Sequence, residues 1–264
     1  MDVKTFLGIE QVTERRWQLE VGTHLITPGQ FLFGGCGLGA ALVAMEEATG
    51  RPTIWATAQY LSYAPTHSTL DIEVEVSISG GHVSQARAVA HVGEREVLTV
   101  NGAFGSNEHD IGGVWVSPPE VPPPLECPPR RLPIEVRNSI FEHVETRVAL
   151  GRTFEEIDGS PGSPNSALWA RVPGHLDPSA ATLAIFGDYV SGGVAHPIGQ
   201  RVMGRSLDNT IRMVQLEETE WVLCDIRMHA LIGGYAQGVA YLWSESGTLL
   251  ATASQSLAIK LWKD

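Results

Sequence analysis

The chain has 264 residues, of which 43% are hydrophobic and 18% charged, a composition typical of a globular protein rather than a disordered one. Its formal net charge of −12 argues against nucleic acid and anionic membranes as partners. No apolar run approaches the roughly 18 residues of a membrane span, and the N-terminal MDVKTFLGIEQ carries no apolar segment before a cleavage site, so we expect neither a span nor a secretory leader.

The first half of the chain begins with a short strand around 16–20 and continues into a helix over 34–50. Apolar residues recur at helical spacing from Leu38 to Met45, and Gly50 ends the helix. In the strand at 70–79, apolar residues alternate with acidic ones, so one face of it is buried and the other wet. The strands expected after the helix are 54–63, 70–79, 83–92 and 96–104.

The clearest break in the pattern is residues 117–133, SPPEVPPPLECPPRRLP, which hold eight of the sixteen prolines. Proline fixes φ and lacks a backbone donor, so this stretch predicts an extended linker. It divides the chain into an N-terminal unit of residues 1–116 and a C-terminal unit of residues 134–264.

The second half repeats the order of the first at an offset of about 151 to 153 residues, which indicates an internal duplication. Its helix is expected over 178–190, with Asp177 as N-cap and Pro178 at the first position. The predicted strands are 140–148, 168–172, 205–214, 221–229, 235–243 and 248–261.

In each unit, one apolar helix and one antiparallel meander must bury each other's apolar faces. The predicted fold class is therefore α+β, with two tandem units, each a curved antiparallel sheet wrapped around a central helix. Three cysteines, odd in number and far apart, favour a reduced cytoplasmic protein over a disulfide framework or a zinc site.

This sequence resembles the double-hotdog acyl-CoA thioesterases of the medium-chain type II kind. The likeness rests on four stretches in the expected order: Phe33–Gly35, Ser206–Ile211, Gly233–Gly238 and Ala253–Leu257. The resemblance implies a cytoplasmic hydrolase of lipid metabolism that forms homo-oligomers. It would split a fatty acyl-CoA with activated water, using neither a metal nor another cofactor.

In that family an aspartate, a glutamine and a hydroxyl residue hold the attacking water. By resemblance the aspartate corresponds to Asp208 and the glutamine to Gln255. The third position is expected at the strand end 227–229, which contains no serine or threonine. We therefore assign His229 to the third role.

Gln255 is informative without the resemblance, because it lies on an otherwise apolar face of its predicted strand. A buried amide is costly unless it is hydrogen-bonded, so it is either a structural core glutamine or one that orients a water or a thioester carbonyl. Its counterpart in the first half falls near Ala103, and that of Asp208 near Thr57, which suggests one site per chain.

The segment Gly34, Gly35, Cys36 and Gly37 opens the first helix, where free amides suit substrate binding and a developing oxyanion. Glycine required by close helix packing is the alternative interpretation. Cys36 could carry a lowered thiolate pKa there, but no nearby histidine supports it as a nucleophile.

Two other functions stay open at this level. A hotdog enoyl-CoA hydratase would pair an aspartate with a histidine, whereas Asp177 and Asp188 have no matching histidine motif. A non-catalytic acyl-CoA-binding protein would fit the absence of a hydroxyl residue at 227–229.

Overall fold

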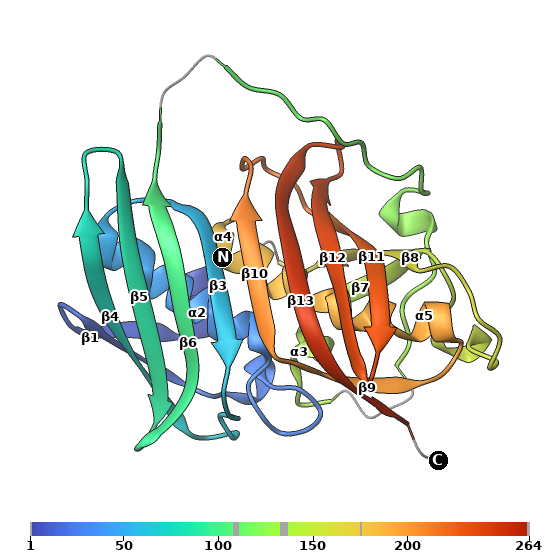
Figure 1. Cartoon of the computed structure of the whole chain (residues 1–264), viewed down its shortest axis with the longest axis horizontal. Coiled ribbons are helices and arrows are strands. Elements are labelled where there is room, and N and C mark those ends of the chain that lie inside the picture. The colour runs from blue at the N-terminus through green and yellow to red at the C-terminus, as the bar shows by residue number, and fades with distance from the viewer. Residues whose placement is uncertain (1, 108–110, 133–136, 175, 263–264) are drawn as a thin grey trace.

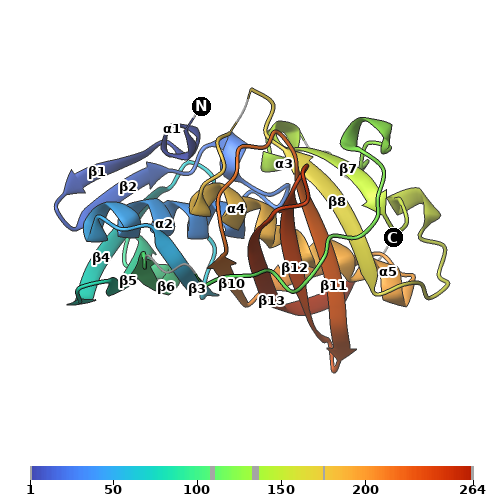
Figure 2. The same ribbon diagram turned by 90° about the horizontal axis from the view of Figure 1, so that it is seen from above.

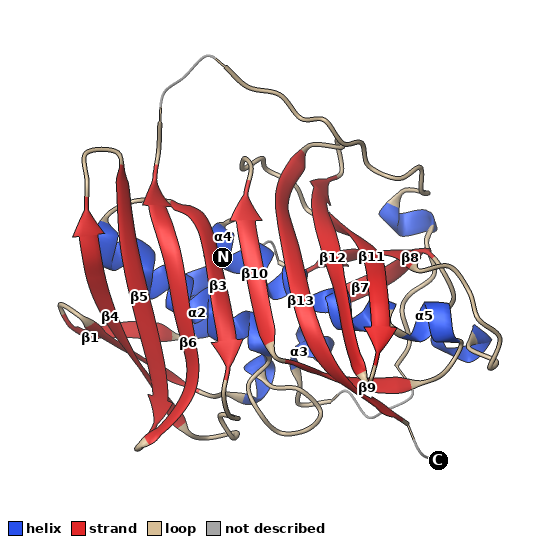
Figure 3. Ribbon diagram, in the orientation of Figure 1, coloured by secondary structure: helices blue, strands red, loops and turns tan. Residues whose placement is uncertain are grey.

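The computed structural model describes residues 2–107, 111–132, 137–174 and 176–262. Residues 133–136, where the predicted linker meets the second unit, lie outside the described residues. The described chain forms a curved, antiparallel sheet of 13 strands (Figure 1). Its longest helices lie on one side of the sheet, which curls around them (Figures 2 and 3).

The first half contains every element predicted for it, with bounds shifted by at most a few residues. The helix that begins at Gly34 ends at Thr49, and Gly50 caps it with a φ of 64°. A first helix and strand were not predicted, because each has only five residues. The elements are α1 (Val3–Leu7), β1 (Ile9–Thr13), β2 (Arg16–Glu20), α2 (Gly34–Thr49), β3 (Thr53–Tyr60), β4 (Thr69–Ser79), β5 (Val83–Val92) and β6 (Arg95–Gly105).

The second half repeats this order, but its central helix is interrupted. Three short helical segments replace the single helix of the first half. The elements are α3 (Ile140–His143), β7 (Glu145–Leu150), β8 (Asn165–Arg171), α4 (Ala180–Gly187), the 3-10 turn η4 (Asp188–Gly193), α5 (Ala195–Ile198), β9 (Val202–Ser206), β10 (Asp208–Met213), β11 (Val222–Ile232), β12 (Tyr235–Ser244) and β13 (Leu249–Leu261).

Three details predicted for this half were wrong, apart from shifts of a few residues at strand ends. The helix α4 starts later than expected, because the Ser179 side chain, not Asp177, accepts the N-terminal hydrogen bond from Thr182. The predicted strand 140–148 begins with one helical turn, α3. The predicted strand 205–214 is divided at Leu207, so that β9 and β10 both pair with β13.

The duplication is visible in the strand order. The sheet runs β2-β4-β5-β6-β3 in the first half and β10-β13-β12-β11-β8 in the second, so the two halves mirror each other across β3 and β10. Thr57 and Thr210 face each other there, 153 residues apart, with their hydroxyls hydrogen-bonded at 2.7 Å. This pair lies on the pseudo-twofold axis that relates the halves.

The two central helices pack with their backbones in contact. A Cβ on Gly35 would come within 2.8 Å of the Ile185 Cα, and one on Gly39 within 3.0 Å of the Ala181 carbonyl oxygen. Larger side chains would push the helices apart. Glycine therefore brings the start of α2 against the end of α4, where the candidate site lies. Within the described residues, none of the helices is long and apolar enough to cross a membrane.

The proline-rich segment is extended apart from one 3-10 turn, Pro124–Glu126, and it packs against the second half. The indole N–H of Trp169 donates to the Pro122 carbonyl at 3.0 Å. Cys127 is buried in a second, smaller hydrophobic cluster that includes Trp169, Trp221 and Trp243. The segment thus forms part of the packing on the side of the sheet away from the helices.

Candidate active site

The interruption of the second helix places a carboxylate in the interior. Asp188 is the first residue after α4 and is only 4% exposed. Its Oδ2 accepts a hydrogen bond from the Gly35 amide at 2.7 Å, and its Oδ1 accepts one from Gln255 Nε2. Both carboxylate oxygens are therefore held by donors, one from each half of the chain.

Gln255 and Ser206 complete the cluster from the adjacent strands. Gln255 lies on β13 and is 2% exposed, and its Nε2 also contacts the Ser206 hydroxyl at 3.3 Å. Ser206 ends β9, which pairs with β13. The Gln255 Oε1 is buried and has no hydrogen-bond partner among the described residues. An unpaired buried acceptor of this kind is suited to a water or substrate hydrogen.

The burial of Asp188 changes its acidity. Desolvation raises the pKa of this carboxyl to about 7, although hydrogen bonds from Gly35, Gln255 and Ser206 act in the opposite direction. A carboxylate with such a pKa can take a proton near neutral pH. Cys36 is fully buried, and burial raises the pKa of its thiol well above the usual value, with the charge of Asp188 adding to the effect. This environment opposes a thiolate nucleophile.

The sequence-predicted residues are only partly brought together. Gln255 is in the cluster, but the carboxylate it contacts is Asp188 and not Asp208. The Asp208 Oδ1 instead accepts a hydrogen bond from the Ser256 amide at 2.7 Å. His229 is exposed and lies where the β11–β12 register is irregular. The structure therefore places Asp208 and His229 outside the cluster around Asp188.

The cluster contains two residues that the sequence analysis did not assign to the thioesterase site, Asp188 and Ser206, although signals for both were present. All eight residues of α4 are buried, and an aspartate follows directly after this apolar helix. Ser206 is the first residue of a stretch that carried the resemblance, so a hydroxyl group was available there. The prediction had placed the hydroxyl position at 227–229 instead.

The amides of the glycine-rich turn are mostly occupied within the protein. Gly35 donates to Asp188, and the Cys36 and Gly37 amides both reach the Phe33 carbonyl, at 3.0 and 3.1 Å. The Gly34 amide has no hydrogen-bond partner among the described residues. Of the four positions predicted to bind substrate, Gly34 therefore offers the free donor.

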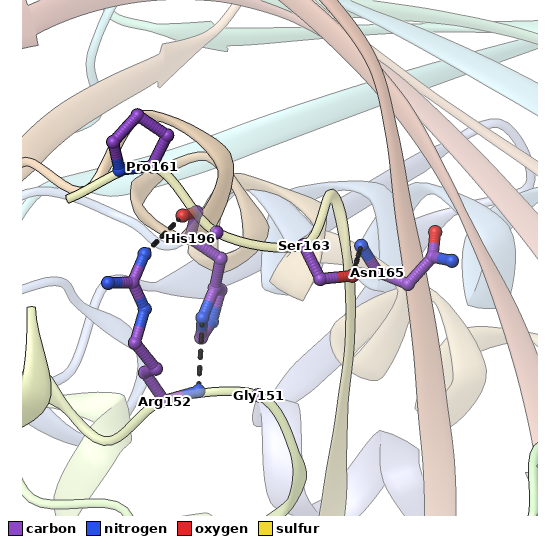
Figure 4. A pocket seen from close by; sticks show the side chains of 7 residues that line it. Gly151, Arg152, Pro161, Ser163, Asn165 and His196 are labelled. Carbon is purple, nitrogen blue, oxygen red and sulfur yellow. Dashed lines mark hydrogen bonds between the residues drawn. The ribbon is translucent and has the colours of Figure 1, made fainter.

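A separate pocket of about 270 Å³ lies beside α5 (Figure 4). There the Arg152 guanidinium donates to the His196 carbonyl at 2.6 Å. Burial, followed by the positive charges of Arg130 and Arg152, lowers the pKa of the His196 imidazole. Among the described residues, no carboxylate lines this pocket, in contrast to the Asp188 cluster. Its lining residues are Gly151, Arg152, Pro161, Gly162, Ser163, Asn165 and His196.

The structure offers little to a metal ion. Among the described residues, no group of three or more His, Cys, Asp or Glu side chains is arranged to hold one. The protein partners that hold the Asp188 carboxylate are an amide, a carboxamide and a hydroxyl. These groups orient a carboxylate, a water or a carbonyl by hydrogen bonding.

Comparison with known proteins identifies the family. A profile described as the acyl-CoA thioesterase C-terminal domain matches residues 119–259. A protein assigned as a thioesterase from Novosphingobium aromaticivorans is 34% identical, with a TM-score of 0.85 over 97% of this chain and 98% of its own. No curated protein sequence gives a significant match.

Two more distant structures share the fold. A hot dog fold protein from Alicyclobacillus acidocaldarius has a TM-score of 0.84 at 18% identity, over 98% of this chain and 97% of its own. Acyl-CoA thioesterase II of Mycobacterium marinum has a TM-score of 0.77 at 19% identity, over 99% of each chain. These likenesses confirm the predicted hotdog fold. The chain belongs to the acyl-CoA thioesterase family, whose reaction is the hydrolysis of an acyl-CoA thioester.

Proposed function

We propose that Asp188, Ser206 and Gln255 together hold and activate the water that hydrolyses the thioester. The observation that carries this proposal is the buried Asp188 carboxylate with a pKa of about 7, in contact with a glutamine whose Oε1 is unpaired. A nucleophilic water has two hydrogens to direct. Asp188 would accept one, and Gln255 Oε1 the other.

In the proposed step, the water oxygen attacks the thioester carbonyl carbon while its proton passes to Asp188. The carbonyl π bond becomes an oxyanion in a tetrahedral intermediate. The intermediate then collapses, the C–S bond breaks, and the CoA sulfur leaves with the proton held by Asp188. The products are the free acid and CoA, with Asp188 returned to its carboxylate form.

Ser206 has a supporting role in this proposal. Its hydroxyl contacts the Gln255 Nε2 at 3.3 Å and helps to lower the pKa of Asp188. It would fix the rotamer of the glutamine and offer a further contact to the water. The hydroxyl residue that the family resemblance requires is thus Ser206 rather than a residue at 227–229.

The finer functional assignments rest on the sequence. We propose a fatty acyl-CoA as substrate, a role in lipid metabolism, a cytoplasmic location and a homo-oligomeric state. Cys36, Cys127 and Cys224 are free and buried, which supports the proposal of a reducing compartment. The oligomeric state and the acyl chain stay predictions from the resemblance.

The test compares substitutions of two aspartates, Asp188 and Asp208. Each variant is assayed with a panel of acyl-CoAs of increasing chain length, and the release of free CoA is measured. Asp188→Asn keeps the shape of the side chain but cannot act as a base, so kcat/KM should fall by about 1,000-fold, within the usual range for a general base. Asp208→Asn is the matched control, because its carboxylate accepts a hydrogen bond from the Ser256 amide and lies outside the Asp188 cluster. Its kcat/KM should fall less than about tenfold.

An opposite result, with Asp208→Asn inactive and Asp188→Asn active, would return the catalytic role to Asp208. The hydratase alternative requires a histidine beside the aspartate. The described hydrogen-bond partners of Asp188 are Gly35, Gln255 and Ser206, which favours hydrolysis over hydration. Tight binding of acyl-CoA to wild type without release of CoA would instead support the non-catalytic binding protein.

A further inference from the structure

A second set of buried polar atoms lies next to Asp188 and has no part in holding it. Tyr60 ends β3, and its hydroxyl is buried without a hydrogen-bond partner among the described residues. Asn209 on β10 is fully buried, and both atoms of its amide are likewise unpaired in the described part of the chain. Unpaired buried polar groups are rare in native proteins and often indicate a ligand.

The position of Gly34 shows how close the Tyr60 hydroxyl is to the carboxylate. The point where a Gly34 Cβ would stand is 2.9 Å from Asp188 Oδ2 and 3.0 Å from the Tyr60 hydroxyl oxygen. The carboxylate and the hydroxyl therefore face the same small space, which glycine leaves free of a side chain. The two oxygens are at most about 6 Å apart, the sum of those distances.

This separation between the two oxygens suits a base that binds the attacking water and a donor that binds the carbonyl oxygen. A water bound to Asp188 stands about 2.7 Å from it, and its oxygen attacks a carbonyl carbon from roughly 3 Å. A donor for the carbonyl oxygen must then lie several ångströms from the carboxylate, beyond the water. The Tyr60 hydroxyl meets this requirement.

The reaction needs such a donor, and the turn that opens α2 supplies few. The amides of Gly35, Cys36 and Gly37 are used by Asp188 and by the Phe33 carbonyl. Of that turn, only the Gly34 amide is unpaired in the described structure. A second donor for the oxyanion is therefore not supplied by the other amides of this turn.

We propose that the Tyr60 hydroxyl, with the Gly34 amide, donates a hydrogen bond to the thioester carbonyl and stabilises the oxyanion formed when water attacks. This inference rests on the proposed function of Asp188. It makes Tyr60 a catalytic residue and gives each half of the chain a separate task. The second half supplies the base and the first half supplies the oxyanion donors.

The surroundings of Tyr60 keep its proton in place. Burial raises the pKa of the phenol well above its usual value, and the charge of Asp188 raises it further, while a polar contact with the Asn209 amide opposes the shift. The phenol is thus a neutral donor throughout the working pH range. Asn209 lies beside it.

The experiment is Tyr60→Phe, measured with the acyl-CoA that wild type hydrolyses best. Loss of one oxyanion donor should lower kcat by about 100-fold with KM changed less than threefold. The unfolding temperature should stay within about 2 °C of wild type or rise, because the lost hydroxyl has no hydrogen-bond partner in the described protein. Tyr63→Phe is the matched control, since Tyr63 is 43% exposed and its ring packs on Phe31.

A ligand without a carbonyl separates the proposed role from a general role in binding. The probe is the S-alkyl-CoA thioether with the same chain as the best substrate. Wild type and Tyr60→Phe should bind it with the same Kd, within about twofold. A kcat reduced less than threefold, or a Kd weakened in parallel with the activity, would overturn the assignment.

The same measurements distinguish this inference from the proposed function. If wild type releases CoA, Asp188→Asn does not, and Tyr60→Phe is as active as wild type, the base assignment stands and the Tyr60 assignment is wrong. If Asp188→Asn retains its activity, the proposed function itself is wrong, whatever Tyr60→Phe does.

Discussion

The two halves of this chain share a fold, but their inner faces have different chemistry. Thr57 and Thr210 pair across the pseudo-twofold axis and are equivalent at an offset of 153 residues. At that offset, Asp188 in the second half corresponds to Gly35 in the first, and the two positions contact each other. The second half provides the Asp188 carboxylate, and the first half provides the Gly35 backbone amide that donates a hydrogen bond to it. The Asp188 cluster thus draws on both halves of the chain.

The glutamine differs between the halves in the same way. Thr210 pairs with Ser254 and Thr57 pairs with Asn101, which makes Gln255 equivalent to Gly102. The counterpart expected near Ala103 is therefore one residue away. A Cβ on Gly102 would come within 2.8 Å of the Trp55 carbonyl oxygen, so a glutamine cannot be accommodated there without rearrangement. This steric difference favours the prediction of one site per chain, which stays a prediction.

The outer faces of the halves differ as well. In the first half, Asp71 on β4 pairs with Gln18 and His91 on its two neighbouring strands, a polar set. At the equivalent place in the second half, Leu223 pairs with Trp169 and Trp243. This apolar set packs with Cys127 and Val121 of the proline-rich segment. A covered sheet face can be apolar, whereas an uncovered one is polar.

Substitutions on the two outer sheet faces should differ most in their effect on stability. Trp169→Ala should lower the free energy of unfolding by about 3–5 kcal/mol, because Trp169 is 5% exposed and its indole binds the Pro122 carbonyl. The equivalent change on the uncovered face, Gln18→Ala, should cost less than about 1 kcal/mol, since it removes one hydrogen bond to Asp71. Urea unfolding of both variants measures the difference. Equal losses would contradict the assignment of a structural role to the proline-rich segment.

The sequence predicted local features of the fold better than the pairing of strands. Alternation and helical spacing predicted the strands and α2, because these patterns reflect burial against one layer. The division at Leu207 was not predictable, because it depends on two short strands sharing β13 as a partner. Burial patterns cannot report which strand is the neighbour.

Of the residues in the Asp188 cluster, the sequence predicted only Gln255, because burial on one face shows in a sequence pattern and a contact between distant residues does not. Gln255 stood out because one amide interrupts an apolar face. Asp188 did not, because its role depends on a contact with Gly35, 153 residues away. Asp208 has the right side chain, but its carboxylate bonds to the backbone of the next strand residue, Ser256, instead of Gln255. Gln255 and Ser256 are neighbours on β13, and the first contacts Asp188 whereas the second contacts Asp208. Sequence spacing does not resolve a difference of one residue in this pairing.

The next prediction concerns the asymmetry at Gln255. Gln255→Leu should lower kcat/KM by about 100-fold, or ~2.7 kcal/mol of transition-state stabilisation, because it removes the donor to Asp188 and the acceptor for the water. Loss of the donor to the buried Asp188 should lower the free energy of unfolding by about 1–3 kcal/mol, so a thermal unfolding curve checks that the variant is folded at the assay temperature. Gln85→Leu, on an exposed position of β5, is the matched control and should leave kcat/KM within twofold. A similar loss in both variants would point to a general effect of the substitution.

The last prediction uses pH to separate Asp188 from the other carboxylates. Desolvation raises its folded pKa to about 7, so the ionised base is present above that value and is lost as pH falls through it. The kcat/KM of wild type should therefore rise about tenfold per pH unit below 7 and level off above it. Because the folded pKa exceeds the ordinary value of 3.8, ionisation of Asp188 costs stability as pH rises from about 4 to 7. Asp188→Asn should remove both effects, giving a flat activity profile and a gain in stability over wild type that is larger at pH 8 than at pH 5. A wild-type profile that is level down to pH 5 would mean that the reacting base is an ordinary exposed carboxylate and not the one held between the two halves.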